Sequence, residues 1–374
     1  MKIAYLLEWE FCKIDGVIKK VLNQLNSWRN LGIEVEIFAL SRCKDIIKID
    51  GIKNYDKDIL NLIYHKPLYN DLKAFNPDIV YFRFNAYKPY LEKIFSDFKC
   101  VIELNTNDVS EAKSEINKGF KYKLIYQYMK LTINRMLNKL PTAVIGVTHE
   151  IANLVKDKPT EVVPNSINLE AMPILKNSPS KNEIPNLFFI SSPHQPWQGV
   201  DKLIYLAKQT QGRLKLHIIG EEKPEGLELD NIKFYGFLSQ EEYREIAKKC
   251  DIAIGSLAIH RRGMVESCSL KVRESLSLGL PLIIAYEETP FIDKEFDWLL
   301  KLENSEDNVK KSIEKIVDFC YKNIDRVVQK DEIREYIDSK VLEKKRVDYL
   351  KFVAKEIKKW EKYAKIYPKY GIIL

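Results

Sequence analysis

The feature that most constrains the fold of this chain is an alternation of short apolar runs with amphipathic helical stretches, and it occurs twice. In the first half a helix is predicted over Gly16–Leu31, among strands predicted at Ile3–Glu8, Val35–Leu40, Ile79–Phe84, Val101–Leu104, Ala143–Val147 and Val162–Val163. In the second half, helices at about 200–210, 240–249 and 270–279 separate strands at Leu187–Ser192, Leu214–Gly220, Ile232–Phe237, Ile252–Leu257 and Leu282–Tyr286. Such alternation is typical of parallel βαβ units in a doubly wound sheet. The sequence therefore predicts an α/β protein with two domains in series.

A polar stretch rich in Pro and Ser, Asn177–Pro185, separates the two halves as a linker would. With 374 residues, the chain is long enough for each half to bury its own core. We expect one domain at 1–170, a linker at 171–185 and a second domain at 186–340. The remaining residues, 341–374, are expected to form a helix that packs back on the first domain.

Composition limits the class of protein. No apolar run reaches the roughly 18–20 residues that span a bilayer, and the apolar start of the chain is too short for a signal peptide. A cytoplasmic protein is therefore expected. The net charge of +7 suits phosphorylated ligands or an anionic membrane surface, although a Lys-rich solvated surface explains it equally well. It does not require nucleic acid, and we expect no nucleic-acid partner.

The stretch 119–140 is rich in Lys, Arg, Tyr and Leu and lacks acidic residues. As a basic amphipathic helix it would contact an anionic membrane surface, which would place the protein at the inner face of the membrane as a peripheral protein. The alternative is a solvated helix that covers the first sheet.

The six cysteines lie at positions 12, 43, 100, 250, 268 and 320 without C-x-x-C spacing, and they are predicted to be reduced and mostly buried. The five histidines are dispersed, so no metal site is predicted. The G-x-G-x-x-G and G-x-x-x-x-G-K-[ST] patterns do not occur in the sequence, which argues against dinucleotide dehydrogenases and P-loop NTPases. No cofactor is expected.

Two carboxylates, Glu266 and Glu274, bracket a small-residue turn and the start of a predicted helix. A helix start offers free backbone N–H groups and the positive end of the helix dipole to a phosphate, and carboxylates accept hydrogen bonds from hydroxyls. Lys271 lies in the first turn, where a cation costs roughly 0.3–1 kcal/mol unless an anion offsets it. Arg261 and Arg262, just before Glu266, also suit phosphate. Together these residues indicate a nucleotide-sugar ligand.

Three further residues are candidates for the site, each with a structural alternative. Gly16 opens the first helix and would let a ligand approach the backbone closely, or would simply form a βα turn. Asn105 follows a strand, where ligands bind in open α/β sheets, but an Asn/Asp turn is as good an explanation. Trp197 would wall a cleft, or would be a buried Trp at a turn.

In their order along nearly the whole chain, these segments resemble the retaining GT-B glycosyltransferases, in particular the family 4 group also called glycosyl transferases group 1. The resemblance rests on the Gly16 turn, the strand-end Glu-Leu-Asn, Val163–Ile167, Pro196–Ile204, and the E-x7-E motif before Gly279–Ile284. It implies two Rossmann-like domains facing a central cleft, with an N-terminal acceptor-binding domain and a C-terminal donor domain. It also implies transfer with retention of configuration and without a metal.

The resemblance also implies residue roles. Glu266 would contact the donor sugar near the reaction centre, Glu274 would bind the ribose, and Gly16 would face the diphosphate. The backbone N–H groups of Ser267, Cys268, Ser269 and Leu270 would bind the diphosphate. The donor site would also include Arg261, Arg262 and Trp197, and Glu266, Lys271 and Asn105 are the predicted catalytic residues.

One departure concerns the charge on the leaving group. Relatives carry Arg and Lys after the first strand of the second domain, where this chain has Pro193 and Gln198. Lys271, Arg261 and Arg262 are the candidates to replace them.

The predicted function is transfer of a sugar from a nucleotide diphosphate sugar, expected to be UDP-linked, to a glycan or lipid-linked acceptor in surface polysaccharide or glycoconjugate synthesis. One alternative is a nucleotide-sugar epimerase of the same fold, for which only His194 and His149 offer acid/base groups. The other is a degenerate, non-catalytic glycosyltransferase subunit. The absence of the Arg and Lys that relatives carry at Pro193 and Gln198 favours this alternative, and the presence of both Glu266 and Glu274 opposes it.

Overall fold

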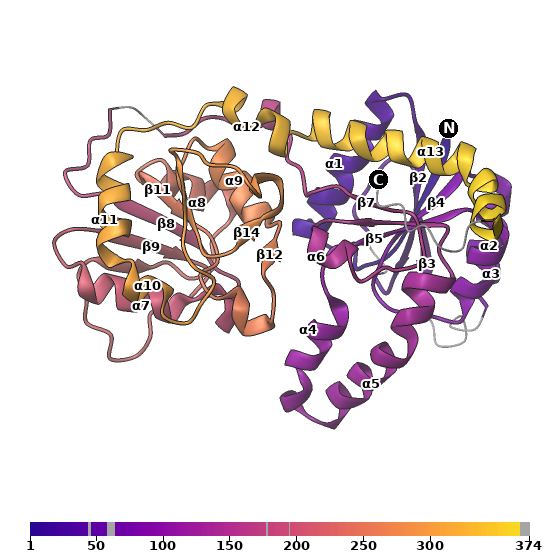
Figure 1. The fold of residues 1–374 in the computed structure, drawn as a ribbon, viewed down its shortest axis with the longest axis horizontal. Coiled ribbons are helices and arrows are strands. Elements are labelled where there is room, and N and C mark those ends of the chain that lie inside the picture. Colours follow the sequence, from indigo (N-terminus) through magenta and orange to yellow (C-terminus); the bar gives the residue numbers. More distant parts are fainter. Residues whose placement is uncertain (44–45, 58–63, 177–178, 194, 367–374) are drawn as a thin grey trace. The chain divides into compact units, whose positions relative to one another are not determined.

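The computed structural model describes residues 1–43, 46–57, 64–176, 179–193 and 195–366, without the side chains of 357–366. The chain divides into two compact units (Figure 1). Unit 1 comprises Met1–Val163 and Glu343–Leu374, and unit 2 comprises Pro164–Leu342. Each is built on a parallel sheet, of seven strands in one and six in the other, so the predicted α/β class is confirmed.

The sheet of unit 1 has the order β3-β2-β1-β4-β5-β6-β7. Its strands are β1 (Lys2–Glu8), β2 (Glu34–Ser41), β3 (Ile52–Asp56), β4 (Ile79–Arg83), β5 (Cys100–Leu104), β6 (Ala143–Gly146) and β7 (Thr160–Val162). From β1 the chain moves outward to β2 and β3 and then resumes on the other side with β4. The direction in which successive strands are added therefore reverses between β1 and β4, and this position is the switch point of the sheet. The sequence did not predict β3, which lacks an apolar run.

Unit 1 also contains helices between and after these strands. They are α1 (Gly16–Asn30), α2 (Lys66–Phe75), α3 (Tyr90–Asp97), α4 (Asp108–Ser114), α5 (Phe120–Asn134), α6 (His149–Ala152) and α13 (Ser339–Ile366), most of which lies in unit 1. Asp15 caps α1 by accepting a hydrogen bond from the Ile18 N–H at 2.9 Å. Helix α1 buries the spaced residues Val21, Leu25 and Trp28, as their periodicity predicts.

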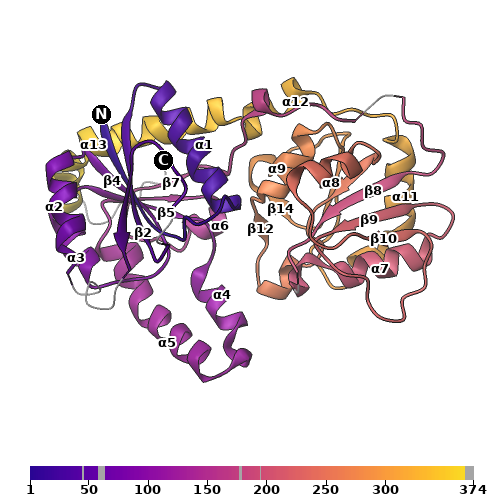
Figure 2. The ribbon, with the colours of Figure 1, turned by 180° about the vertical axis from the view of Figure 1, so that it is seen from behind.

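Helices α4 and α5 extend away from the sheet of unit 1 in both views (Figures 1 and 2). Helix α5 buries none of its residues. Within the described residues, no helix is both long and apolar enough to cross a membrane.

The sheet of unit 2 has the order β10-β9-β8-β11-β13-β15. Its strands are β8 (Asn186–Ile190), β9 (Lys215–Ile219), β10 (Ile232–Phe234), β11 (Ile252–Ile254), β13 (Leu282–Ile284) and β15 (Leu299–Lys301). Along β8, Phe188 packs into one buried cluster, and Leu187 and Phe189 pack into another. Both faces of the sheet are thus buried, as a parallel sheet requires.

Unit 2 also contains a separate two-stranded ladder of β12 (Glu266–Ser267) and β14 (Glu287–Glu288). Its helices are α7 (Val200–Gln209), α8 (Gln240–Ala247), α9 (Leu270–Ser277), α10 (Asn308–Lys311), α11 (Ile313–Lys322) and α12 (Lys330–Ile337). Helices α7, α8 and α9 fall where the sequence predicts them.

The structure corrects the prediction that all six cysteines are reduced, because Cys12 and Cys43 form a disulfide with Cα atoms 5.7 Å apart. Strands β1 and β2 are parallel neighbours, so the segments that follow them meet at one edge of the sheet. Spacing along the sequence does not reveal this. Glu10 brings a ligand-type atom within 4.8 Å of both sulfurs, but here the sulfurs are bonded to each other. The other four cysteines are free and buried.

Candidate functional site

The E-x7-E segment forms a strand, a turn and a helix in unit 2. Glu266 is buried in β12, where it pairs with Glu287 of β14, and α9 begins after the N-cap residue Ser269. No side chain caps the first turn of α9. The backbone N–H groups at this helix start therefore have no capping side chain to bind, and an anion is a natural partner for such groups.

The turn before α9 is fixed from behind by Asn165. Its backbone N–H donates to Cys268 Sγ at 2.9 Å, and its Nδ2 donates to the Cys268 carbonyl oxygen at 2.7 Å. Arg273 contributes a second contact, from its guanidinium to Cys268 Sγ at 3.0 Å. The Cys268 side chain is consequently buried in the structure, and only its backbone is a candidate ligand.

Beneath the turn lies a buried ion pair that sequence reasoning missed. Arg273 and Glu288 approach to 2.5 Å, and both side chains are fully buried. Burial raises the pKa of Glu288, with the nearby Glu266 adding to the effect and Arg273 opposing it. Nothing in the spacing of Arg273 marks it as a partner of Glu288, because the pairing depends on the β12–β14 ladder.

The carboxylate of Glu274 already has protein partners. The Tyr243 hydroxyl lies 2.9 Å from both oxygens, Gln240 Nε2 donates to Oε1 at 2.7 Å, and Arg244 lies 3.4 Å from Oε1. An ionised carboxylate has about four lone-pair positions. Oε1 has three partners, whereas Oε2 has Tyr243 alone among the described residues. Oε2 therefore retains capacity for a hydroxyl.

Lys271 reaches the loop after β8. Its Nζ donates to Ser192 Oγ at 2.9 Å and to Gln198 Oε1 at 3.3 Å. Burial lowers the pKa of Lys271 to about 8, with Glu221 opposing the shift. Gln198 is 1% exposed, and among the described residues its Nε2 has no hydrogen-bond partner. A buried amide N–H without an acceptor in the described part of the chain thus lies beside an ammonium whose two hydrogen-bond partners are neutral.

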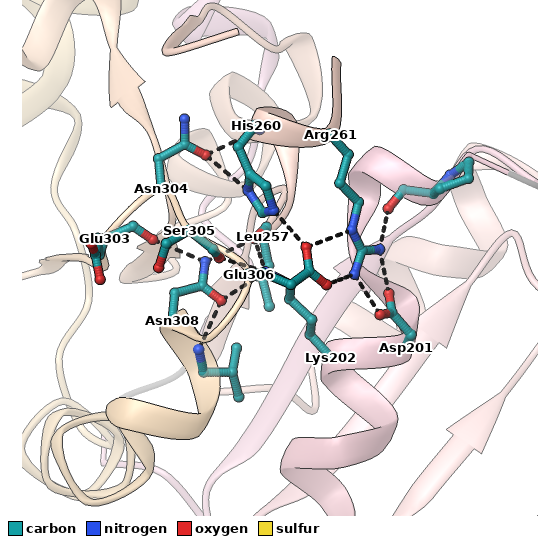
Figure 3. A network of polar contacts seen from close by, with 12 residues as sticks. Asp201, Lys202, Leu257, His260, Arg261, Glu303, Asn304, Ser305, Glu306 and Asn308 are labelled. Atoms are coloured by element: carbon teal, nitrogen blue, oxygen red, sulfur yellow. Dashed lines mark hydrogen bonds and ion pairs between the residues drawn. The ribbon is translucent and has the colours of Figure 1, made fainter. Parts of the chain in front are cut away.

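Arg261 takes part in a different network (Figure 3). It donates to Asp201 through two nitrogens at 2.9 and 2.7 Å, to Glu306 through Nε at 3.0 Å and through a second nitrogen, and to the Pro196 carbonyl oxygen at 2.9 Å. All five of its N–H groups are used. We therefore leave Arg261 out of the proposed donor ligands. Arg262 lies over the ring of Trp197, with 5.1 Å from its Cζ to the ring centroid.

Two predicted site residues lie in unit 1. A Cβ added to Gly16 would meet no atom within 4 Å, and its backbone is not in the left-handed region, so the fold itself does not require a glycine here. Asn105 follows β5, where its Nδ2 donates to Glu103 at 3.3 Å and its Oδ1 accepts from Lys20. His194 lies outside the described residues, and His149 begins α6 behind the capping Thr148.

Comparison with known proteins finds one family model that matches part of the chain. Residues 172–318 match the family model described as Glycosyl transferases group 1. No curated protein sequence matches the chain significantly.

Solved structures match nearly the full length. A lipopolysaccharide outer core galactosyltransferase, WaaB, in its apo form is 16% identical with a TM-score of 0.64 over 94% of this chain and 99% of that one. A glycosyltransferase from Rickettsia africae ESF-5 is 14% identical, with a TM-score of 0.65 over 95% and 99%. Anabaena Alr3699/HepE in complex with UDP and glucose is 16% identical, with a TM-score of 0.62 over 94% and 99%.

The fold is therefore of the GT-B type over the length of the chain, as predicted. The match to the glycosyl transferases group 1 model is confined to residues 172–318, which lie in unit 2.

Proposed function

We propose that this protein is a retaining glycosyltransferase that moves a sugar from a UDP-sugar to a glycan or lipid-linked acceptor in surface polysaccharide or glycoconjugate synthesis. The observation that carries the proposal is the Lys271 ammonium, which donates to Gln198 Oε1 beside the start of α9, together with the buried Gln198 Nε2, which has no acceptor among the described residues. A buried donor without an acceptor costs about 1–3 kcal/mol, and the oxygens of a diphosphate would satisfy both groups.

This arrangement supports a phosphate-binding cation at a different position in the sequence from that expected in relatives. Gln198 occupies the position at which relatives are expected to carry a clamp lysine, and the Lys271 ammonium lies 3.3 Å from its side chain. Charge that relatives supply from the loop after β8 is supplied here from the first turn of α9. The proposed leaving-group site consists of Lys271, Gln198 and the backbone N–H groups of 267–270.

The other donor contacts follow from the same turn. Glu266 is proposed to bind the donor sugar, and Oε2 of Glu274 to accept a hydrogen bond from a ribose hydroxyl. Retention is proposed to follow front-face attack, in which the acceptor oxygen bonds to the anomeric carbon as its bond to the diphosphate breaks. A donor phosphate oxygen takes the acceptor proton. Anabaena HepE, which has this fold, has been solved with UDP, and this supports UDP as the carrier.

Helix α5 supports a membrane-facing acceptor. Phe120, Leu124 and Leu131 are 75%, 55% and 80% exposed. Lys121, Lys123 and Lys130 lie on the same helix, which has no acidic residue. We propose a cytoplasmic protein that touches the anionic inner face of the membrane through α5. The domain limits at residues 170 and 340, with a linker at 171–185, also stay predictions.

The donor site is tested by the shift in melting temperature on adding UDP or UDP-sugars, because a bound ligand stabilises the folded state by mass action. We expect the wild type to be stabilised by UDP, and Lys271→Met to lose about 10–100-fold in UDP affinity, which corresponds to one charged hydrogen bond of about 1.5–3 kcal/mol. Arg213→Gln, which removes an exposed ion pair with Glu314, is the matched control. Equal affinities in all three proteins would refute the proposed phosphate site.

The reaction class is tested with Glu266→Ala in a UDP-release assay. We expect acceptor-dependent release of UDP from the wild type and loss of most turnover in the variant, with UDP affinity kept. An epimerase would instead convert the donor sugar without releasing UDP, and a non-catalytic subunit would bind UDP-sugar without turnover.

A further inference from the structure

A second cluster of charged residues lies in unit 1, at the carboxyl ends of β4 and β5 and on the helix that follows β1. The strand order switches direction between β1 and β4. In open α/β sheets, ligands bind outside the carboxyl ends of the strands at such a switch point. The position of the cluster is therefore that of a ligand site.

Three cations surround one carboxylate in this cluster. Glu103, at the end of β5, lies 3.0 Å from Lys20 Nζ, 3.0 Å from Arg346 and 3.4 Å from Arg83. The side chain of Glu103 is fully buried. Burial raises the pKa of this carboxyl, but the three cations outweigh burial and hold the pKa well below its usual range.

The charges in the cluster do not balance. Arg346 also pairs with Glu343 at 2.9 Å, so within the described part of the chain Lys20, Arg83 and Arg346 pair with two carboxylates, Glu103 and Glu343. Burial lowers the pKa of Lys20 to about 8, with Glu103 opposing the shift and the nearby Arg83 and Arg346 contributing to it. One positive charge is in excess where solvent is largely excluded.

A second carboxylate at this edge shows the same imbalance. Glu8, the last residue of β1, is 6% exposed. It lies 2.6 Å from Lys57 Nζ and 4.0 Å from Lys88 Nζ. Two cations thus lie near one buried carboxylate at the end of β1 as well.

The cations differ in what else they contact. Arg346 points inward, with further hydrogen bonds to the Tyr81 hydroxyl at 3.0 Å and the Val163 carbonyl oxygen at 3.4 Å. Arg83 ends β4 with its side chain 14% exposed, and Lys20 bonds to Asn105 just past β5. Arg83 and Lys20 are therefore the groups placed to meet a ligand, with the amide of Asn105 beside them.

We propose that Arg83, Lys20 and Asn105 form an acceptor site that selects an acceptor bearing an anionic group, a phosphate or a carboxylate, next to the sugar to be extended. This inference rests on the proposed transferase function and adds the chemical class of its acceptor. The anion would supply the charge that the cluster lacks, and the Asn105 amide would accept or donate a hydrogen bond to a sugar hydroxyl.

The test uses the full chain and three probes that share the same sugar ring configuration and the same octyl chain. Octyl glucoside is neutral, octyl glucuronide carries a carboxylate on the sugar, and an octyl glucosyl phosphodiester carries a phosphate between sugar and chain. Binding is measured by calorimetry below the micelle concentration for the wild type, Arg83→Gln and Arg29→Gln. Arg29 is the matched control, because it lies in the last turn of α1.

We expect at least one anionic probe to bind the wild type at least tenfold more tightly than the neutral probe. Arg83→Gln should remove this advantage, while Arg29→Gln keeps it. A preference for the glucuronide indicates an acidic sugar, and a preference for the phosphodiester indicates a phosphate-linked lipid. Equal or absent binding of all three probes, or an anionic preference that survives in Arg83→Gln, would overturn the proposal.

Failure of this proposal is distinguishable from failure of the transferase proposal. The UDP contacts proposed for Lys271, Gln198 and Glu274 all lie in unit 2, and we expect Arg83→Gln to bind UDP as the wild type does. A protein that binds UDP but shows no anionic preference keeps the transferase proposal and loses only the acceptor class.

Discussion

Lys271 shows how one residue gains its chemistry from its surroundings. An ammonium in the first turn of a helix is disfavoured by the dipole, and burial makes its charge still more costly. Its hydrogen-bond partners in the described part of the chain, Ser192 and Gln198, are neutral. A residue in this position weakens the unliganded protein, and it becomes favourable once an anion is bound.

The pH dependence of donor binding follows from this. Because the pKa of Lys271 in the unliganded protein is about 8, the ammonium is present below that pH and is lost above it. UDP affinity should be nearly constant from pH 6.5 to 7.5 and should fall above pH 8 by up to about tenfold per unit. Calorimetric titration at each pH measures this profile.

Two variants identify the titrating group. Lys271→Met should bind UDP weakly with a flat profile over the same range. The double variant Lys271→Met/Gln198→Lys returns an ammonium to the loop position and should recover part of the affinity. A wild-type profile that persists in Lys271→Met would assign the titration to another group.

At the scale of elements, the sequence predicts helix α9, but it does not predict the contacts that hold the turn before this helix. Helix α9 is visible in the periodicity and in the Gly279 stop, and Glu266 and Glu274 are visible as a spaced pair. The contacts of Asn165 with Cys268 and of Arg273 with Glu288 join segments that no local pattern connects. The same is true of the Cys12–Cys43 disulfide, which depends on the pairing of β1 with β2.

Helix α5 carries a prediction at this scale. Basic residues near an anionic membrane contribute about 1 kcal/mol each, so Lys121→Glu/Lys123→Glu should cost at least about 2 kcal/mol of vesicle affinity, roughly 30-fold. Sedimentation with vesicles containing phosphatidylglycerol measures the effect, which added salt should weaken in the wild type. Lys208→Glu/Lys215→Glu, in unit 2, is the control with the same charge change. Equal losses in both double variants would assign the effect to net charge instead of α5.

At the scale of the whole chain, α13 contacts unit 1 through residues that lie far along the sequence from their partners. Arg346 reaches the Tyr81 hydroxyl across 265 positions, and Glu343 accepts from Trp28 Nε1 at 2.9 Å. The alternation of strands and helices predicts the sheet of unit 1, and the apolar spacing of the last segment predicts a helix. Neither pattern reveals that a buried Arg346 pairs with both Glu103 and Glu343.

The last prediction concerns the ion pairs that Arg346 forms with Glu343 and Glu103. Arg346→Met removes the guanidinium that lies 2.9 Å from the buried Glu343 carboxylate, and it leaves Glu103 with two cations in place of three. Breaking a buried pair from one side costs about 3–5 kcal/mol, whereas removing both charges is often close to neutral. Arg346→Met/Glu343→Gln, which keeps an acceptor for Trp28, should therefore regain most of the stability that the single variant loses. Denaturant unfolding of the three proteins measures this, and a double variant as unstable as Arg346→Met would mean that packing of the Arg346 side chain, and not charge balance, holds α13 to the sheet.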